Sequence, residues 1–165
     1  MWALDTAYIP MVRGFVYPTA AFDVFSHKVL AHKVAITLEA GHAKEIIEKA
    51  FAKYGVPEIV NTDRGSQFTA TEFTDAVLEP GCRLSMQGRS AWRNNLFVER
   101  LWLSVKYDRL YLKAYDSVSA ARADIAEYLA WCNAQRSHSS LDRLTSAGSS
   151  QVRIPEIVNA DSGRR

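Results

Sequence analysis

The sequence predicts a single α/β domain, a sandwich in which helices pack on a mixed β-sheet. Three observations support this class: period-two alternation at the start of the chain, alternating helix and strand patterns in the middle, and two helical patterns towards the end. At 165 residues, 48% of them hydrophobic, the chain is long enough for one core and short for two domains.

The first 38 residues predict an antiparallel meander of three strands. Large apolar side chains at positions 2, 4 and 8 alternate with small ones, and Asp5 falls on the small-residue side. The segments 15–25 and 28–38 predict the next two strands, after a turn at 13–15. Pro18 predicts an edge strand or a bulge, because proline cannot donate to a β-ladder.

The middle of the chain predicts two helices and two short strands. An apolar stripe predicts a helix that ends at Gly55; its members are Ala43, Ile46, Ile47, Ala50 and Phe51. PEIV at 57–60 predicts a strand, and NTDRGSQF at 61–68 predicts a loop. Thr69 and Glu72 form a capping-box pattern for a helix that runs to about Leu78.

The remaining elements complete the sandwich. Residues 82–86 predict a brief strand, 87–93 a polar loop, and 94–111 and 117–134 two helices. After His138 no periodicity is sustained, so 142–165 is expected to be a weakly ordered tail.

Charge is unevenly distributed, although the net charge is only +2. Residues 1–82 contain 7 Lys and Arg against 10 Asp and Glu, whereas residues 83–122 contain 8 against 3. This suits a site where carboxylates hold cations and basic groups hold phosphates, and it also suits an ordinary mixed-charge surface. Cys82 and Cys132 are expected to be buried thiols, and no run of residues suits a membrane span or a targeting segment, so the expected location is the cytoplasm.

Three acids occupy informative places: Asp5 within a strand, Asp63 just past a strand, and Glu99 on a helix. Converging carboxylates are what two divalent cations need in order to activate an attacking oxygen and stabilise a leaving one in phosphodiester chemistry. The alternative is structural: Asp63 begins a turn with Arg64 and Gly65, and Glu99 pairs with an arginine.

The spacing favours the first interpretation, because 35 residues lie between Asp63 and Glu99. With WALDTAYIPM, NTDRGSQFT, NNLFVERLWLSVKYDRLYL and WCNAQRSHSSL in this order, the chain resembles the DDE transposase and retroviral-type integrase core. Within that group it is similar to the OrfB-type transposases of bacterial insertion sequences of the IS-three group. The resemblance covers 1–141, which is therefore expected to be an integrase-type catalytic core.

The resemblance implies a ribonuclease H-like fold with a mixed five-stranded sheet flanked by helices. It implies that Asp5, Asp63 and Glu99 are catalytic and bind two Mg²⁺ or Mn²⁺ ions. It also implies DNA cleavage and strand transfer in a bacterial cell, with insertion-sequence ends and target DNA as partners, by a homo-oligomer.

Six further residues are candidate DNA contacts. Lys106 and Asn95 share a helix face with Glu99, and a lysine at this place contacts DNA in the family. The arginines Arg89 and Arg93 suit phosphate contacts, whereas Ser66 and Gln67 suit either DNA or the turn after Asp63.

Departures from the family pattern set up two alternatives. Ala7, Asn94 and Ser137 replace residues common in relatives, and the family's continuation after Leu141 is lost, as in a truncated copy. The chain would then be a non-catalytic remnant that binds DNA or intact transposase. A nuclease that cuts without joining is the third hypothesis.

Overall fold

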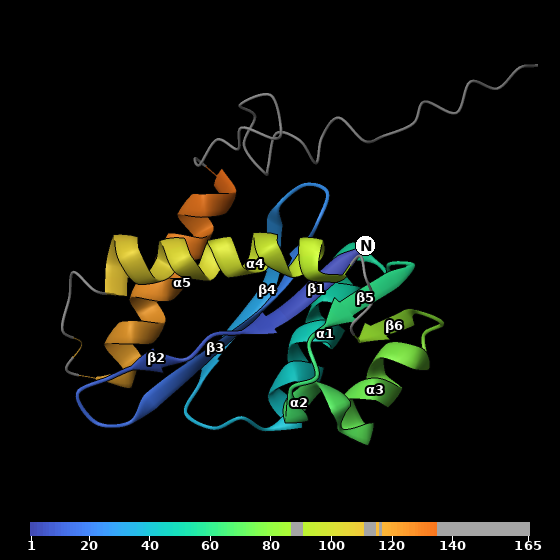
Figure 1. The fold of residues 1–165 in the computed structure, drawn as a ribbon, viewed down its shortest axis with the longest axis horizontal. Helices are drawn as coiled ribbons and strands as arrows, with labels where there is room; N and C mark the ends of the chain where they lie inside the picture. The colour runs from blue at the N-terminus through green and yellow to red at the C-terminus, as the bar shows by residue number, and fades with distance from the viewer. Residues whose placement is uncertain (87–90, 111–114, 116, 135–165) are drawn as a thin grey trace, which may run out of the picture.

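A mixed β-sheet forms the centre of the molecule in the computed structural model, which describes residues 1–86, 91–110, 115 and 117–134 (Figure 1). The strands are β1 (Trp2–Thr6), β2 (Ile9–Pro10), β3 (Phe15–Asp23), β4 (Lys28–Ala35), β5 (Ile59–Thr62) and β6 (Arg83–Met86). The sheet pairs β3 antiparallel with β1, β2 and β4, and β5 parallel with β1 and β6. The five predicted strands are therefore confirmed, and the two-residue β2 joins them.

Strand β3 corrects the expectation from Pro18. It is paired on both sides, with β4 along one side and with β1 and β2 along the other, so it is not an edge strand. Pro18 lies where the partner changes from β1 to β2, and its carbonyl accepts the Ala7 N–H at 2.9 Å. The register shift between β3 and β4 lies further on, between Ala21 and Phe22.

Helices account for most of the remaining described chain. They are α1 (Ala40–Tyr54), α2 (Ser66–Thr69), α3 (Thr71–Leu78), α4 (Ala91–Val105), the short π-helix η1 (Lys106–Leu110) and α5 (Val118–Ala134). The expected end of α1 is confirmed, since Gly55 has a φ of 81°. The helix expected over 94–111 begins three residues earlier and changes to π-helical geometry at Lys106.

Two details of the middle region differ from the sequence prediction. The expected loop 61–68 holds the end of β5 and most of α2. The predicted capping box is wrong, because Thr69 belongs to α2 and its hydroxyl donates to the Ser66 carbonyl. Helix α3 begins after Ala70 without a side-chain cap.

Helices cover both faces of the sheet and create two hydrophobic cores (Figure 1). One core lies beneath α4 and α5 and includes Ala3, Val98 and Ile125. The other lies beneath α1, α2 and α3 and includes Leu4, Ile47 and Phe73. Neighbouring residues of β1 thus face opposite cores, which is what strand alternation requires.

Both cysteines are buried free thiols, as the sequence predicts. None of the helices in the described ranges is long and apolar enough to cross a membrane.

Candidate active site

Asp5 lies on the face of β1 that α4 covers. The residues two before and two after it, Ala3 and Ala7, belong to the core beneath α4, together with Val98 and Trp102 of that helix. Because the alanine side chains are small, α4 packs closely across β1. The period-two pattern read from the sequence therefore determines which helix meets Asp5.

This packing brings Asp5, Glu99 and Lys106 to one pocket of about 290 Å³. Its other lining residues are Thr6, Ala7, Tyr8, Trp102 and Leu103. Glu99 and Lys106 are seven residues apart and meet in this pocket, as their helical spacing predicts. Lys106 opens η1, the π-helical stretch that follows α4.

The electrostatic environment of Asp5 is unfavourable to its own negative charge. Burial, and then the neighbouring Asp63 and Glu99 carboxylates, raise the Asp5 pKa to about 7. The backbone hydrogen bond from Thr6 and the Lys106 ammonium act in the opposite direction. Asp63 and Glu99 are thus each close enough to influence Asp5, and Lys106 is a cation that acts on the same carboxyl.

Asp63 follows β5 directly. Since β5 runs parallel to β1, the residues that follow both strands lie at the same edge of the sheet. One Asp63 carboxylate oxygen accepts the Gly65 N–H at 2.9 Å, so the turn considered in the sequence alternative does form. This bond orients the carboxylate and occupies only one of its two oxygens.

Gln67 is placed differently from the sequence expectation. The residue is only 6% exposed, and its side-chain amide donates to the Thr6 hydroxyl at 3.3 Å. Thr6 is in turn bonded to the Thr19 hydroxyl at 2.8 Å. The predicted DNA contact at Gln67 therefore does not fit this structure, because the amide serves to tie α2 to β1.

The other candidate contacts are resolved to different degrees. Ser66 is exposed at the start of α2. Arg93 and Asn95 lie on the first turns of α4, so residues 91–93 are helical and not part of the expected loop. The side chains of Arg93 and Asn95 fall outside the described structure. Arg89 and His138 lie outside the described residues, as does the tail 142–165.

Comparison with known proteins agrees with this arrangement. The family model of the integrase core domain matches residues 1–90, and a second integrase core domain model matches residues 81–145. The chain belongs to the integrase core domain family.

Individual relatives extend the comparison. The transposase for insertion sequence element IS904 of Lactococcus lactis subsp. lactis is 26% identical over 145 residues, which cover 86% of this chain and 57% of the relative. The chain spans about half the length of the curated relatives it matches. The resemblance to insertion-sequence transposases is thereby confirmed.

Solved structures show the same fold. The simian T-cell lymphotropic virus intasome in complex with the PP2A regulatory subunit B56 gamma aligns with a TM-score of 0.75 at 17% identity, covering 99% of this chain and 57% of that one. The HTLV-2 integrase catalytic core domain in complex with magnesium aligns with a TM-score of 0.61 at 18% identity, covering 89% and 92%. The ribonuclease H-like fold is thus confirmed for this integrase core domain.

The donor chemistry of the site suits a hard divalent cation. Mg²⁺ and Mn²⁺ prefer carboxylate oxygens, and a cation beside Asp5 would favour the ionised carboxylate that burial disfavours. Across the described ranges, no three His, Cys, Asp or Glu side chains lie close enough to form a ready group of metal ligands. Asp5 and Glu99 therefore line one pocket, with Asp63 near enough to affect Asp5, but the three acids do not form a closed ligand set.

The sequence did not identify two residues that line this integrase-core pocket. Tyr8 was expected on the bulky face of a strand with Trp2 and Leu4, but β1 ends at Thr6 and the alternation ends with it. Tyr8 instead lines the pocket with 54% of its surface exposed, and Leu103 lines it with 49% exposed. Their distance along the chain from the predicted acids was the signal that could have identified them. Tyr8 follows Asp5 by three residues, and Leu103 follows Glu99 by four, which is about one helical turn.

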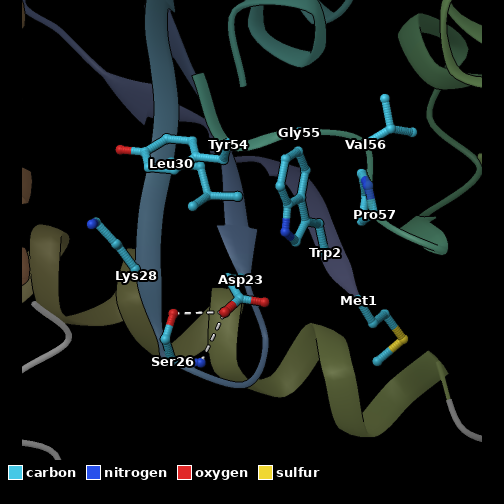
Figure 2. Close-up of a pocket in the computed structure, with 10 residues that line it drawn as sticks. All are labelled: Met1, Trp2, Asp23, Ser26, Lys28, Leu30, Tyr54, Gly55, Val56 and Pro57. Carbon is cyan, nitrogen blue, oxygen red and sulfur yellow. Dashed lines mark hydrogen bonds between the residues drawn. The ribbon is translucent and has the colours of Figure 1, made fainter. Parts of the chain in front are cut away.

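A second pocket, of about 330 Å³, lies at the opposite end of β1 (Figure 2). Trp2, Leu30 and Pro57 give it apolar walls. Its acid, Asp23, accepts hydrogen bonds from the backbone N–H and the hydroxyl of Ser26 at 3.1 and 2.6 Å. Both bonds end on Oδ2 and fix the Asp23 carboxylate within the turn before β4. None of the predicted site residues that the structure describes lines this second pocket.

Proposed function

We propose that this integrase core catalyses metal-dependent DNA cleavage and strand transfer. The observation that carries the proposal is the Asp5 pocket, where two acids and Lys106 converge and Asp63 is near enough to raise the Asp5 pKa. The names of its relatives support DNA as the substrate, since the IS904 protein is a transposase.

The reaction has two phosphoryl-transfer steps. In the first, a water oxygen bonds to phosphorus and the bond to the 3′ oxygen breaks, which leaves a 3′-hydroxyl and a 5′-phosphate. In the second, the 3′-hydroxyl oxygen bonds to the phosphorus of another phosphodiester and displaces a new 3′-hydroxyl. Neither step needs a covalent enzyme intermediate, so positioning and charge stabilisation account for the catalysis.

Asp5, Asp63 and Glu99 would hold Mg²⁺ or Mn²⁺, which when bound would polarise the phosphate and lower the pKa of water. The HTLV-2 neighbour, whose structure contains magnesium, supports this choice of metal. Lys106 would pair its ammonium with a non-bridging phosphate oxygen and so fix the phosphodiester against the acids. The Gly65 N–H holds Asp63 in place for this task.

The same proposal covers partners. Insertion-sequence ends and target DNA would both bind at the Asp5 pocket, and a homo-oligomer would hold the two DNA segments together. The named assemblies of the neighbours, an intasome and a dimeric integrase core, support an oligomer.

The test uses the whole chain with Mn²⁺ or Mg²⁺, supercoiled plasmid DNA, and the variants Asp63→Asn and Glu99→Gln. We expect the wild type to nick the plasmid and to join labelled 3′ ends to it, and both variants to lose these activities at least 100-fold. The matched control Asp75→Asn changes an exposed acid on α3 and should leave activity intact.

Thermal unfolding separates the competing outcomes. Mn²⁺ at a hundred times its dissociation constant should stabilise the wild type by about 2.7 kcal/mol and both variants by much less. Nicking without joining would identify a nuclease. DNA binding with neither nicking nor metal stabilisation would identify a non-catalytic remnant and overturn the proposal.

A further inference from the structure

We propose that Tyr8 is a stacking platform for a nucleobase next to the phosphodiester that is cut. This inference rests on the proposed function and assigns the pocket a second contact with its DNA substrate. Binding of a phosphate and its metal ions accounts for the charged groups of the pocket. It does not account for the aromatic ring of Tyr8, which lines the same pocket.

The surroundings of Tyr8 hold it in a defined place. The preceding Ala7 N–H donates to the Pro18 carbonyl at 2.9 Å, and the following Ile9 pairs with Val16 in β2 and β3. The Tyr8 ring meets the Tyr17 ring edge-on, with centroids 5.3 Å apart and an interplanar angle of 87°. The ring is therefore anchored on both sides by the sheet rather than carried on a free loop.

Tyr8 is open to solvent although its backbone neighbours are held by the sheet. Tyr8 lines the pocket that also contains Asp5, Glu99 and Lys106, yet 54% of its surface is exposed. Leu103, which is 49% exposed, lines the same pocket from α4. The pocket therefore combines charged groups with an exposed ring and an exposed aliphatic side chain.

This combination of charged groups and an exposed ring suits the binding of one nucleotide. Its phosphate suits the charged groups, and its base has a flat π-face that an anchored aromatic ring can stack on regardless of sequence. Stacking requires the base to leave its neighbours, so a strand that is already frayed or unpaired beside the cut would bind best. The pre-anchored ring loses little freedom on binding, because Tyr17 already restricts it.

The experiment combines protein variants with altered DNA. The substrate is an end-labelled oligonucleotide that the whole wild-type chain nicks in Mn²⁺, prepared with an abasic residue at each position in turn. The variants are Tyr8→Ala, Tyr8→Phe, Tyr8→Trp and Tyr8→Leu, with Phe25→Ala as a control at another exposed aromatic ring.

We expect Tyr8→Ala and Tyr8→Leu to reduce nicking of intact DNA about 5-fold to 150-fold, the range that base–aromatic stacking gives. Tyr8→Phe and Tyr8→Trp should keep the activity, because they keep a flat ring. The wild type should show the same loss when the abasic residue lies next to the cut, and Tyr8→Ala should lose nothing further on that DNA. A structural role of Tyr8 would not produce this coupling.

A second readout does not depend on turnover. Single-stranded DNA that carries 2-aminopurine should lose fluorescence on binding the wild type, Tyr8→Phe and Tyr8→Trp, and lose much less on binding Tyr8→Leu. If the wild type nicks DNA while Tyr8→Leu matches it on intact and abasic strands, the stacking inference is wrong and the proposed function stands. If the wild type neither binds nor nicks DNA, both are wrong.

Discussion

The Asp5 carboxylate should make the metal-free protein less stable as the pH rises. Its pKa is about 7 in the folded protein against an ordinary value of 3.8, so the folded state binds the proton more tightly than the unfolded chain does. Below pH about 4 the carboxyl is largely protonated in both states, so it does not make the free energy of unfolding depend on pH. Between about pH 4 and 7 only the unfolded chain loses the proton, and the free energy of unfolding falls by about 1.4 kcal/mol per pH unit, to a total of about 4 kcal/mol.

The variant Asp5→Asn tests this value, since it keeps the shape of the side chain and removes the charge. In buffer with a chelator, its free energy of unfolding in urea should exceed that of the wild type by about 4 kcal/mol more at pH 8 than at pH 4. In thermal unfolding at pH 8 this corresponds to about 2–4 °C for each kcal/mol. Glu79→Gln, at an exposed position after α3, is the control and should follow the wild type.

Parallel stability curves for the wild type and Asp5→Asn between pH 5 and 8 would refute the reasoning, because they would mean that Asp5 ionises as freely in the folded protein as in the unfolded chain. Saturating Mn²⁺ should narrow the gap at pH 8, since a bound cation favours the ionised carboxylate. The cation thus offers a second check on the same electrostatic cause.

Three further predictions concern the scaffold of the site. Ala3→Leu should destabilise the protein by about 1–3 kcal/mol in urea unfolding, because Ala3 is fully buried beneath α4, whereas the exposed Ala52→Leu should change little. Thr6→Val should lower the free energy of unfolding by about 1–3 kcal/mol, because Thr19 and Gln67 each lose a hydrogen-bond partner. A double-mutant cycle with Thr19→Val should show a coupling energy well above zero. Asn133→Ala should speed hydrogen exchange at the Val29 amide selectively, since the Asn133 side chain bonds both the N–H and the carbonyl of Val29 at 2.9 Å; unchanged exchange would show that the edge of β4 does not need this contact.

Much of the fold could be predicted because hydrophobic periodicity records which face of each element is buried. The stripe from Ala43 to Ala50 and the alternation in β1 both correspond to buried faces in the structure. The end of β5 could not be found in this way, because Asn61 and Thr62 are polar and yet only 1% exposed. They are placed by pairing with Ser85 and Met86 of β6, which is a long-range contact that local pattern does not contain.

Prediction from local sequence patterns was also wrong at the junction of α2 and α3. Thr69 and Glu72 have the right spacing for a capping box, but α2 ends where α3 begins, so Thr69 is already committed to the preceding helix. Gln67 also belongs to α2 rather than to a loop. Its position after Asp63 suggested a DNA contact, whereas the fold of α2 turns its side chain inward to Thr6.

The candidate site divides into a part that the sequence determines and a part that the cation would determine. Ala3 and Ala7 flank Asp5 on the side that α4 covers, and these small side chains admit the helix. Glu99 of α4 and Lys106, which opens η1, then line the same pocket. Closing the ligand set is a different problem, because burial raises the Asp5 pKa and the neighbouring Asp63 and Glu99 carboxylates raise it further. A cation between them reverses the sign of this interaction. The scaffold therefore fixes where the acids meet, and metal binding is the step that would draw them together, which is why Mn²⁺ should stabilise the wild type and have much less effect on Asp63→Asn.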